Sequence, residues 1–115
     1  MTVEVDPSML KRMMDEVSKF GATPAGGLNR QAGSTDHGRA RDWLRQQLLE
    51  RGYEIRIDAI GNLYGILRQA DRKRPTIMTG SHLDSQPFGG RFDGCVGFSG
   101  FLNHHLINRG WRFAQ

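Results

Sequence analysis

The sequence predicts an α/β fold, in which a mixed sheet is flanked by helices within a single domain spanning residues 1–115. Apolar residues recur at helical spacing in the first fifty positions. Residues 53–67 and 75–79 instead form short alternating or apolar runs, which are typical of strands. Glycine-rich segments separate these blocks and indicate loops. The resulting order is helix, helix, strand, strand, strand, helix.

Two helices are expected in the first half of the chain. The first begins at Asp6-Pro7, where Asp can cap the helix and Pro suits its first turn, and it ends at Gly21. The second runs from Asp36 to Arg51, and Gly52 ends it. Residues 21–34 between them read as a long loop, which suggests either a lid or substrate-facing segment, or a mobile surface loop. The expected apolar faces are Leu10, Met13, Met14, Val17 and Phe20 in the first helix, and Ala40, Trp43, Leu44 and Leu48 in the second.

The second half of the chain is expected to carry the strands and a last helix. Residues 53–58 alternate strictly, so they predict a half-buried strand, which a turn at Gly61-Asn62 pairs with residues 63–67. The apolar run 75–79 predicts a central strand. A helix then starts near Asp93, with glycines at positions 94, 97 and 100. Each internal glycine costs roughly 1 kcal/mol relative to alanine, so we expect this helix to pack closely against a strand.

Composition limits the partners that are expected. The net charge is +4, but the basic residues are scattered, and the one cluster (Arg68, Arg72, Lys73 and Arg74, around Asp71) has no interleaved aromatic residues. We therefore expect no nucleic-acid partner. No apolar run approaches the roughly 20 residues that span a bilayer, and the N-terminus does not look like a signal peptide. The single cysteine, Cys95, excludes an internal disulfide and fits a reducing compartment, so we expect a cytoplasmic protein without a membrane partner.

Polar residues are concentrated in residues 79–94 (TGSHLDSQPFGGRFDG), between a predicted strand and a predicted helix. Ligands of open α/β sheets bind outside the carboxyl ends of strands. If the strand continues, His82 and Asp84 share one face, so that the carboxylate can accept one ring N–H while the other ring nitrogen binds a metal. Asp93 is expected at the N-cap of the last helix, where the helix dipole keeps a carboxylate ionised and able to bridge two cations.

Three other interpretations of these residues compete with a metal site. A Ser-His-Asp triad of Ser81, His82 and Asp84 is disfavoured, because adjacent residues on a strand point to opposite faces. The three glycines after Asp93 match neither the Walker nor the dinucleotide fingerprint of a phosphate-binding loop. A lone His-x-Asp pair can also be an ordinary part of a polar surface, so the residues alone leave metal binding open.

A family resemblance favours the metal site. The stretch SHLDSQPFGGRFDG resembles the metal-binding signature of the M20-type metallohydrolases. Its GGRFDG portion resembles the branch of N-carbamoyl-L-amino-acid hydrolases, allantoate amidohydrolases and β-ureidopropionases. Residues 26–30 (GGLNR), 40–44 (ARDWL) and 58–63 (DAIGNL) also resemble this family's N-terminal region. The resemblance implies that residues 1–115 are an incomplete, N-terminal part of a zinc-peptidase-like catalytic domain without its dimerisation domain.

The resemblance also implies roles and partners. His82 would ligate one metal, Asp93 would bridge two, and Asp84 would be the catalytic-site residue that orients His82. The two divalent ions would be zinc or manganese, with cobalt and nickel as further candidates, and they would activate a water that attacks a carbamoyl or ureido substrate. In relatives, the peptide bond at the Asp93–Gly94 position can be cis. The parent protein would be a homodimer.

The family's Glu-Glu pair and two later histidines cannot be found in this chain, and no acidic residue follows Asp93. We therefore expect the isolated chain to bind metal weakly and to be inactive. The alternatives are a fragment of an M20 aminoacylase or peptidase, and a non-catalytic remnant that acts only by association.

Overall fold

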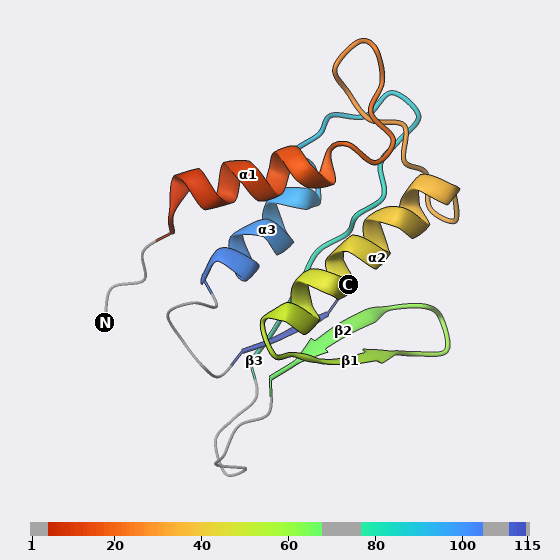
Figure 1. The fold of residues 1–115 in the computed structure, drawn as a ribbon. Coiled ribbons are helices and arrows are strands. Elements are labelled where there is room, and N and C mark those ends of the chain that lie inside the picture. Colours follow the sequence, from red (N-terminus) through yellow and green to blue (C-terminus); the bar gives the residue numbers. More distant parts are fainter. Residues whose placement is uncertain (1–4, 68–76, 105–110, 115) are drawn as a thin grey trace.

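The structure is a computed structural model that describes residues 5–67, 77–104 and 111–114 (Figure 1). The predicted basic cluster at residues 68–74 lies outside the described residues. Within them, three helices and four strands follow the order α1, α2, β1, β2, β3, α3, β4. Helices and a mixed sheet are both present, so the predicted α/β class is confirmed. The element bounds are α1 Pro7–Val17, α2 Thr35–Glu50, β1 Glu54–Ile57, β2 Leu63–Ile66, β3 Ile77–Gly80, α3 Cys95–His104 and β4 Trp111–Ala114.

Helix α1 begins as the sequence predicts. The carboxylate of Asp6 accepts hydrogen bonds from the backbone N–H groups of Ser8 (2.9 Å) and Met9 (3.3 Å), which caps the helix. The helix ends at Val17, a turn earlier than predicted, because the chain tightens into shorter-range bonds such as Phe20 N–H to the Val17 carbonyl. Gly21 follows with a φ of +81°, so it still marks the exit from the helical region.

Helix α2 starts at Thr35, one residue before the predicted start, because Ser34 acts as its cap and accepts a hydrogen bond from His37 N–H at 3.1 Å. Its predicted apolar face is confirmed, since Ala40, Leu44 and Leu48 are fully buried. The helix packs on β1 and β2. The approach is close: a Cβ at Gly65 of β2 would lie only 2.6 Å from a Leu48 methyl group, so β2 needs a glycine there.

Strands β1 and β2 form the predicted antiparallel hairpin, with Ile55 opposite Gly65. The strict alternation of residues 53–58 does not become a matching alternation of burial, because Ile55 is half-buried whereas Ile57 is exposed.

The sheet differs from the prediction at β3 and β4. Its order is β1-β2-β4-β3, with β4 antiparallel to β2 and parallel to β3. Residues 75 and 76 of the predicted central strand lie outside the described residues. For residues 77–79 the central position is wrong in the described sheet, because β3 lies at its edge and Met78 is 68% exposed. Strand β4 was not predicted, because a four-residue Trp-Arg-Phe-Ala stretch has no distinctive pattern and is defined by the two strands that it joins.

Helix α3 lies beside α1 and contacts β3 (Figure 1). Close packing at its start is confirmed for Gly97, where a Cβ would come within 2.7 Å of the Ser81 hydroxyl. A Cβ at Gly100 would meet no atom within 4 Å, so packing does not explain that glycine. The prediction that Asp93 is the N-cap is wrong, because the helix starts at Cys95, two residues after Asp93.

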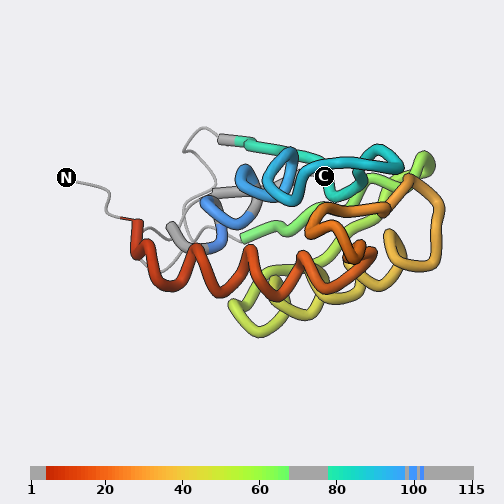
Figure 2. The backbone as a smooth tube through the Cα atoms, turned by 90° about the horizontal axis from the view of Figure 1, so that it is seen from above, coloured from red at the N-terminus to blue at the C-terminus, as the bar shows by residue number. Residues whose placement is uncertain are grey.

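The loop of residues 21–34 is fastened to the site segment rather than free above it. Leu28, which is buried, exchanges two backbone hydrogen bonds with Gly89 (2.8 and 3.0 Å), and the backbone of Arg30 bonds to Ser85 at two points (2.7 and 2.8 Å). Figure 2 shows this loop in orange, running beside the turquoise segment that follows β3. The loop therefore packs against the segment that carries the site and supports it, rather than forming the lid that its length suggested.

Candidate functional site

The His82–Asp84 pair lies just after β3, which ends at Gly80. The two residues leave the strand as an irregular segment, yet their side chains still meet. His82 Nδ1 is 3.1 Å from both the carbonyl oxygen and the carboxylate Oδ1 of Asp84. Both of these atoms are acceptors, so Nδ1 is the nitrogen that donates in this arrangement, and Nε2 is the nitrogen left to face a metal. This tautomer is the one that a metal-binding histidine needs when a carboxylate orients it.

Asp93 approaches the same imidazole from the other end of the motif. Its Oδ2 lies 3.8 Å from His82 Nε2, and its side chain is 89% exposed. Two ligands at about 2.0–2.1 Å from a tetrahedral zinc lie about 3.4 Å apart, so a small movement of Asp93 would let both atoms share one ion. The donor set therefore fits a divalent metal, although only in part: the described residues contain no group of three or more His, Cys, Asp or Glu side chains that could hold one.

Gly94 forms the wall behind His82. It has a φ of +71°, and a Cβ there would lie 2.2 Å from the His82 carbonyl oxygen and 2.8 Å from its ring atoms Nδ1 and Cε1. The glycine that follows the predicted bridging carboxylate thus leaves room for the imidazole close to the backbone. The Asp93–Gly94 peptide is trans, as are all peptide bonds among the described residues, so the cis bond that the family resemblance suggested is not found here.

The structure also decides the triad alternative. The Ser81 hydroxyl donates to the carbonyl of Gly94 and so ties the end of β3 to the start of α3. It makes no hydrogen bond with His82, as the opposite-face argument predicted. Ser81 is a structural link in this site rather than a nucleophile paired with a base.

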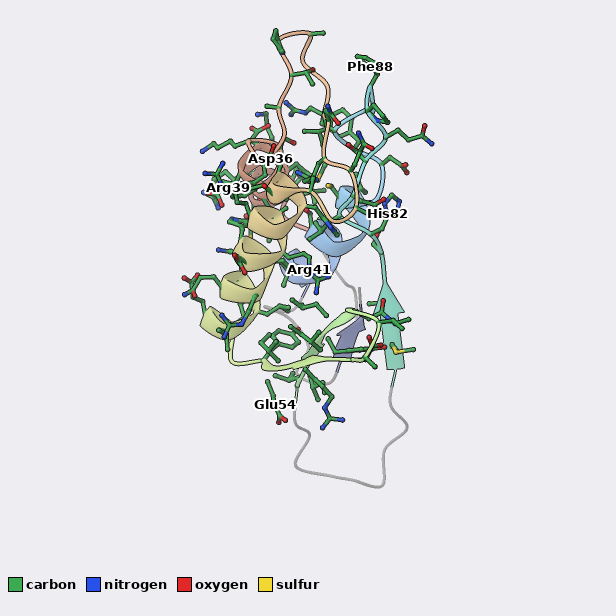
Figure 3. All side chains as sticks on the ribbon, turned by 90° about the vertical axis from the view of Figure 1, so that its right-hand side faces the viewer. Asp36, Arg39, Arg41, Glu54, His82 and Phe88 are labelled. Carbon is green, nitrogen blue, oxygen red and sulfur yellow. The ribbon has the colours of Figure 1, made fainter. Side chains whose placement is uncertain are left out.

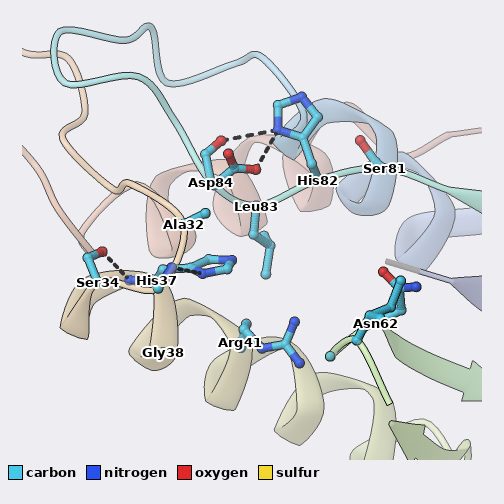
Figure 4. Close-up of a pocket in the computed structure, with 13 residues that line it drawn as sticks. Ala32, Ser34, His37, Gly38, Arg41, Asn62, Ser81, His82, Leu83 and Asp84 are labelled. Carbon is cyan, nitrogen blue, oxygen red and sulfur yellow. Dashed lines mark hydrogen bonds and ion pairs between the residues drawn. The ribbon is translucent and has the colours of Figure 1, made fainter. Parts of the chain in front are cut away.

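A pocket of about 560 Å³ opens beside the pair, between the start of α2, the β1–β2 turn and the segment after β3. Figure 4 shows His82 and Asp84 on one wall, with His37, Arg41 and Asn62 around the other walls. Arg41 is half-buried and forms no ion pair with the described part of the chain. The pocket is thus positive on the α2 side and can accept an anionic group.

Sequence reasoning did not single out His37 or Arg41, because they come close to residue 84 only when α2 packs on the sheet. His37 Nδ1 accepts a hydrogen bond from Gly33 N–H at 3.1 Å, which a protonated ring cannot do. Burial, aided by the nearby Arg41 charge, lowers the pKa of His37 against an opposing pull from Asp84.

Asp58 shapes the β1–β2 turn that forms another side of the pocket. Its carboxylate accepts hydrogen bonds from the backbone of Ile60 (3.1 Å) and Asn62 (2.9 Å), and from the side chains of Asn62 (2.8 Å) and Tyr64 (3.0 Å). These bonds, the Asn62 side chain first, lower the pKa of Asp58. The DAIGNL block recognised in the sequence is therefore a carboxylate-centred turn that presents Gly61 and Asn62 to the pocket.

No protein-family model matches the chain, but individual proteins do. A Mycolicibacterium smegmatis protein, named as a hydrolase without a substrate, is 45% identical over 109 residues; the match covers 84% of this chain and 25% of that protein. The allantoate amidohydrolase of Escherichia coli (strain K12) is 36% identical over 70% of this chain and 20% of its own length. Other relatives are named ureidoglycolate hydrolases and N-carbamoyl-L-amino-acid amidohydrolases.

Solved structures of similar fold belong to the same group of enzymes as these sequence relatives. A hydantoinase/carbamoylase family amidase from Burkholderia ambifaria superposes with a TM-score of 0.90 at 34% identity, covering 98% of this chain and 30% of that chain. This chain thus spans between a fifth and a third of the length of these relatives. The resemblance recognised in the sequence is confirmed, and the short coverage is consistent with an N-terminal portion of an M20-family protein. None of the described helices is long and apolar enough to cross a membrane.

Proposed function

Because this chain shares sequence and fold with the hydantoinase/carbamoylase family of amidases over the part of their length that it spans, we propose that it forms one half of a two-metal site that hydrolyses a linear ureido or carbamoyl C–N bond. One observation carries the proposal. The imidazole of His82 is held at Nδ1 by Asp84 while its Nε2 faces the carboxylate of Asp93 at 3.8 Å.

Each residue has a defined task in this proposal. A pair of divalent ions, zinc or manganese, supplies an activated water and polarises the scissile carbonyl when bound. Asp84 keeps the Nδ1 proton of His82 in place, so that Nε2 remains an unprotonated ligand. Asp93 offers two carboxylate oxygens and is exposed enough to turn toward an ion on either side.

The chain supplies two ligands, fewer than the three protein ligands that a catalytic zinc usually keeps. The reaction also needs a general base, and no acidic residue follows Asp93 in this sequence. We therefore propose that the chain alone binds metal weakly and does not turn over substrate. The complete site, and the homodimer of the parent protein, would require further sequence.

A chimera tests the proposal. Residues 5–104 would replace the matching segment of the N-carbamoyl-L-amino-acid amidohydrolase of Geobacillus stearothermophilus, to which this chain is 36% identical over 87 residues. We expect metal-dependent release of ammonia from an N-carbamoyl amino acid, and loss of that activity in the same chimera carrying His82→Ala.

The isolated chain is assayed beside the chimera, and no ammonia release is expected from it. A folded chimera that cleaves an N-acetyl amino acid but no carbamoyl substrate would favour the aminoacylase alternative. A folded chimera that cleaves neither would favour a non-catalytic remnant.

A further inference from the structure

Arg30 is completely buried, which is unusual for a residue that always carries a positive charge. In the described part of the chain it forms no salt bridge with a carboxylate. Its guanidinium instead donates to backbone carbonyls: Nε to Leu83 at 2.7 Å, and Nη1 to Val17 at 2.6 Å and to Phe20 at 2.8 Å. Its Nη2 contacts the Cys95 sulfur at 2.9 Å. A buried charge without such bonds would be strongly unfavourable, so these four contacts offset the cost of burying the guanidinium.

Several partners of Arg30 lie next to the proposed metal-site residues in the sequence. Leu83 lies between His82 and Asp84 in the sequence, so a bond to its carbonyl fixes the backbone that carries both side chains. The backbone of Arg30 then holds Ser85 on the far side of Asp84 through two further hydrogen bonds. Cys95, two residues after Asp93, starts α3 and is held by the same guanidinium. One side chain therefore joins both ends of the motif.

We propose that Arg30 is the positioning residue of the metal site, which sets the backbone of residues 82–85 relative to Asp93 so that His82 Nε2 and the Asp93 carboxylate face one ion. This inference rests on the proposed function, because it presupposes that His82 and Asp93 bind a metal. It also extends that function, since neither the motif nor the metal ligands include residue 30. Arg30 itself touches neither the metal nor the substrate.

The fork shape of the guanidinium is what the role requires. It reaches Leu83, Val17, Phe20 and Cys95 in diverging directions, which the single ammonium of lysine cannot do. We therefore expect Arg30→Lys to retain the charge but lose the positioning, and Arg30→Met to retain much of the volume but lose both.

The test compares the full chain with Arg30→Lys, Arg30→Met and a matched core control, Leu48→Ala. Leu48 is also completely buried, but it packs under Gly65 of β2 rather than beside the site. Folding is checked by circular dichroism. Two readouts follow in the folded proteins: Zn²⁺ affinity by calorimetry, and the protonation pattern of the His82 ring nitrogens in the metal-free chain by ¹⁵N NMR.

We expect the parent chain to show a proton on Nδ1, and the two Arg30 variants to show mixed tautomers and a Zn²⁺ affinity about 10–100-fold lower. Leu48→Ala should unfold more easily yet keep the tautomer and the affinity. A folded Arg30 variant that kept the Zn²⁺ affinity and the His82 tautomer of the parent chain would overturn the proposal. Equal losses of affinity and of the single tautomer in Leu48→Ala would also overturn it. If Arg30→Met fails to fold, Arg30→Lys decides. If the parent chain binds no Zn²⁺, the proposed function fails, while the tautomer comparison still decides the role of Arg30.

Discussion

The two stretches of the motif, residues 81–85 and residues 86–93, are held very differently. In the first, Leu83 is fully buried in the core, and Arg30, Ser81 and Ser85 tie the backbone to α1, α3 and the 21–34 loop. In the second, Phe88 is 100% exposed at the loop tip labelled in Figure 3, and Phe92 and Asp93 are also exposed. A backbone bridge to Leu28 and the ion pair of Arg91 with Asp15 (2.7 Å) hold this stretch.

The contrast separates the two proposed ligands. The His82 ring is held at Nδ1 by Asp84 without a metal, so less conformational entropy is lost when an ion binds. Asp93 is left free to adjust by the few tenths of an ångström that separate its present position from a shared ion. We expect substitutions in the first stretch to affect the site strongly, and substitutions in the second to affect it weakly, Asp93 excepted.

The largest effect is expected for Gly94→Ala. The added methyl group meets the His82 carbonyl and ring, and alanine disfavours a φ of +71°, so we expect a loss of about 2 kcal/mol or more in the free energy of unfolding. Gly100→Ala, inside α3 and with open space around it, is the control and should stabilise by up to about 1 kcal/mol. Urea denaturation of both variants measures the difference. Equal stabilities would show that Gly94 does not confine His82.

Asp84→Asn should have the next largest effect. The amide can still occupy the same space but can present its NH₂ group to Nδ1, so the ring is no longer held in one tautomer. We expect Zn²⁺ affinity to fall about 10–100-fold with little change in stability. Asp36→Asn, at a half-buried position in the first turn of α2, provides the control for loss of one negative charge. The role of Asp84 would be refuted if both variants weakened binding by the same factor.

The smallest effect is expected for Arg91→Ala. Its partner Asp15 also pairs with Lys11, whose hydrogen bond is the main cause that lowers the pKa of Asp15. Ion pairs at the surface contribute little, so Zn²⁺ affinity should change less than about fivefold. A carboxylate whose pKa is lowered by folding stabilises the fold at every pH above its ordinary pKa. It loses that contribution as the pH falls through its pKa in the folded chain. Stability of the parent chain should therefore exceed that of the variant at pH 7 and converge with it in acid, which denaturation across pH would show.

The parts of the fold that were predicted correctly are those that neighbouring residues determine. Helical spacing predicts which faces are buried, as it does for Met13 and Val17 and for Leu44 and Leu48. The Gly61-Asn62 turn predicts the hairpin. Strand β4 could not be predicted, because its place between β2 and β3 depends on residues that are distant in sequence. The edge position of β3 was missed for the same reason, since an apolar run reports burial but not the order of strands.

The candidate site divides in the same way. His82, Asp84 and Asp93 could be selected from the motif, and the structure brings all three side chains together. Arg30 could have been found only from its place in the GGLNR block, because composition gives no reason to bury an arginine. Its contacts reach back to residue 17 and forward to residue 95, and only the folded chain brings them together.

The central claim is that His82 and Asp93 bind one divalent ion together. The most direct test is a calorimetric titration of the chain with Zn²⁺ at pH 7, alongside His82→Ala, Asp93→Ala and the double variant. We predict weak, saturable binding by the parent chain, loss of that binding in either single variant, and no further loss in the double variant. Parental affinity in Asp93→Ala, or independent and additive losses, would contradict the claim and leave His82-x-Asp84 as a hydrogen-bonded pair without a metal.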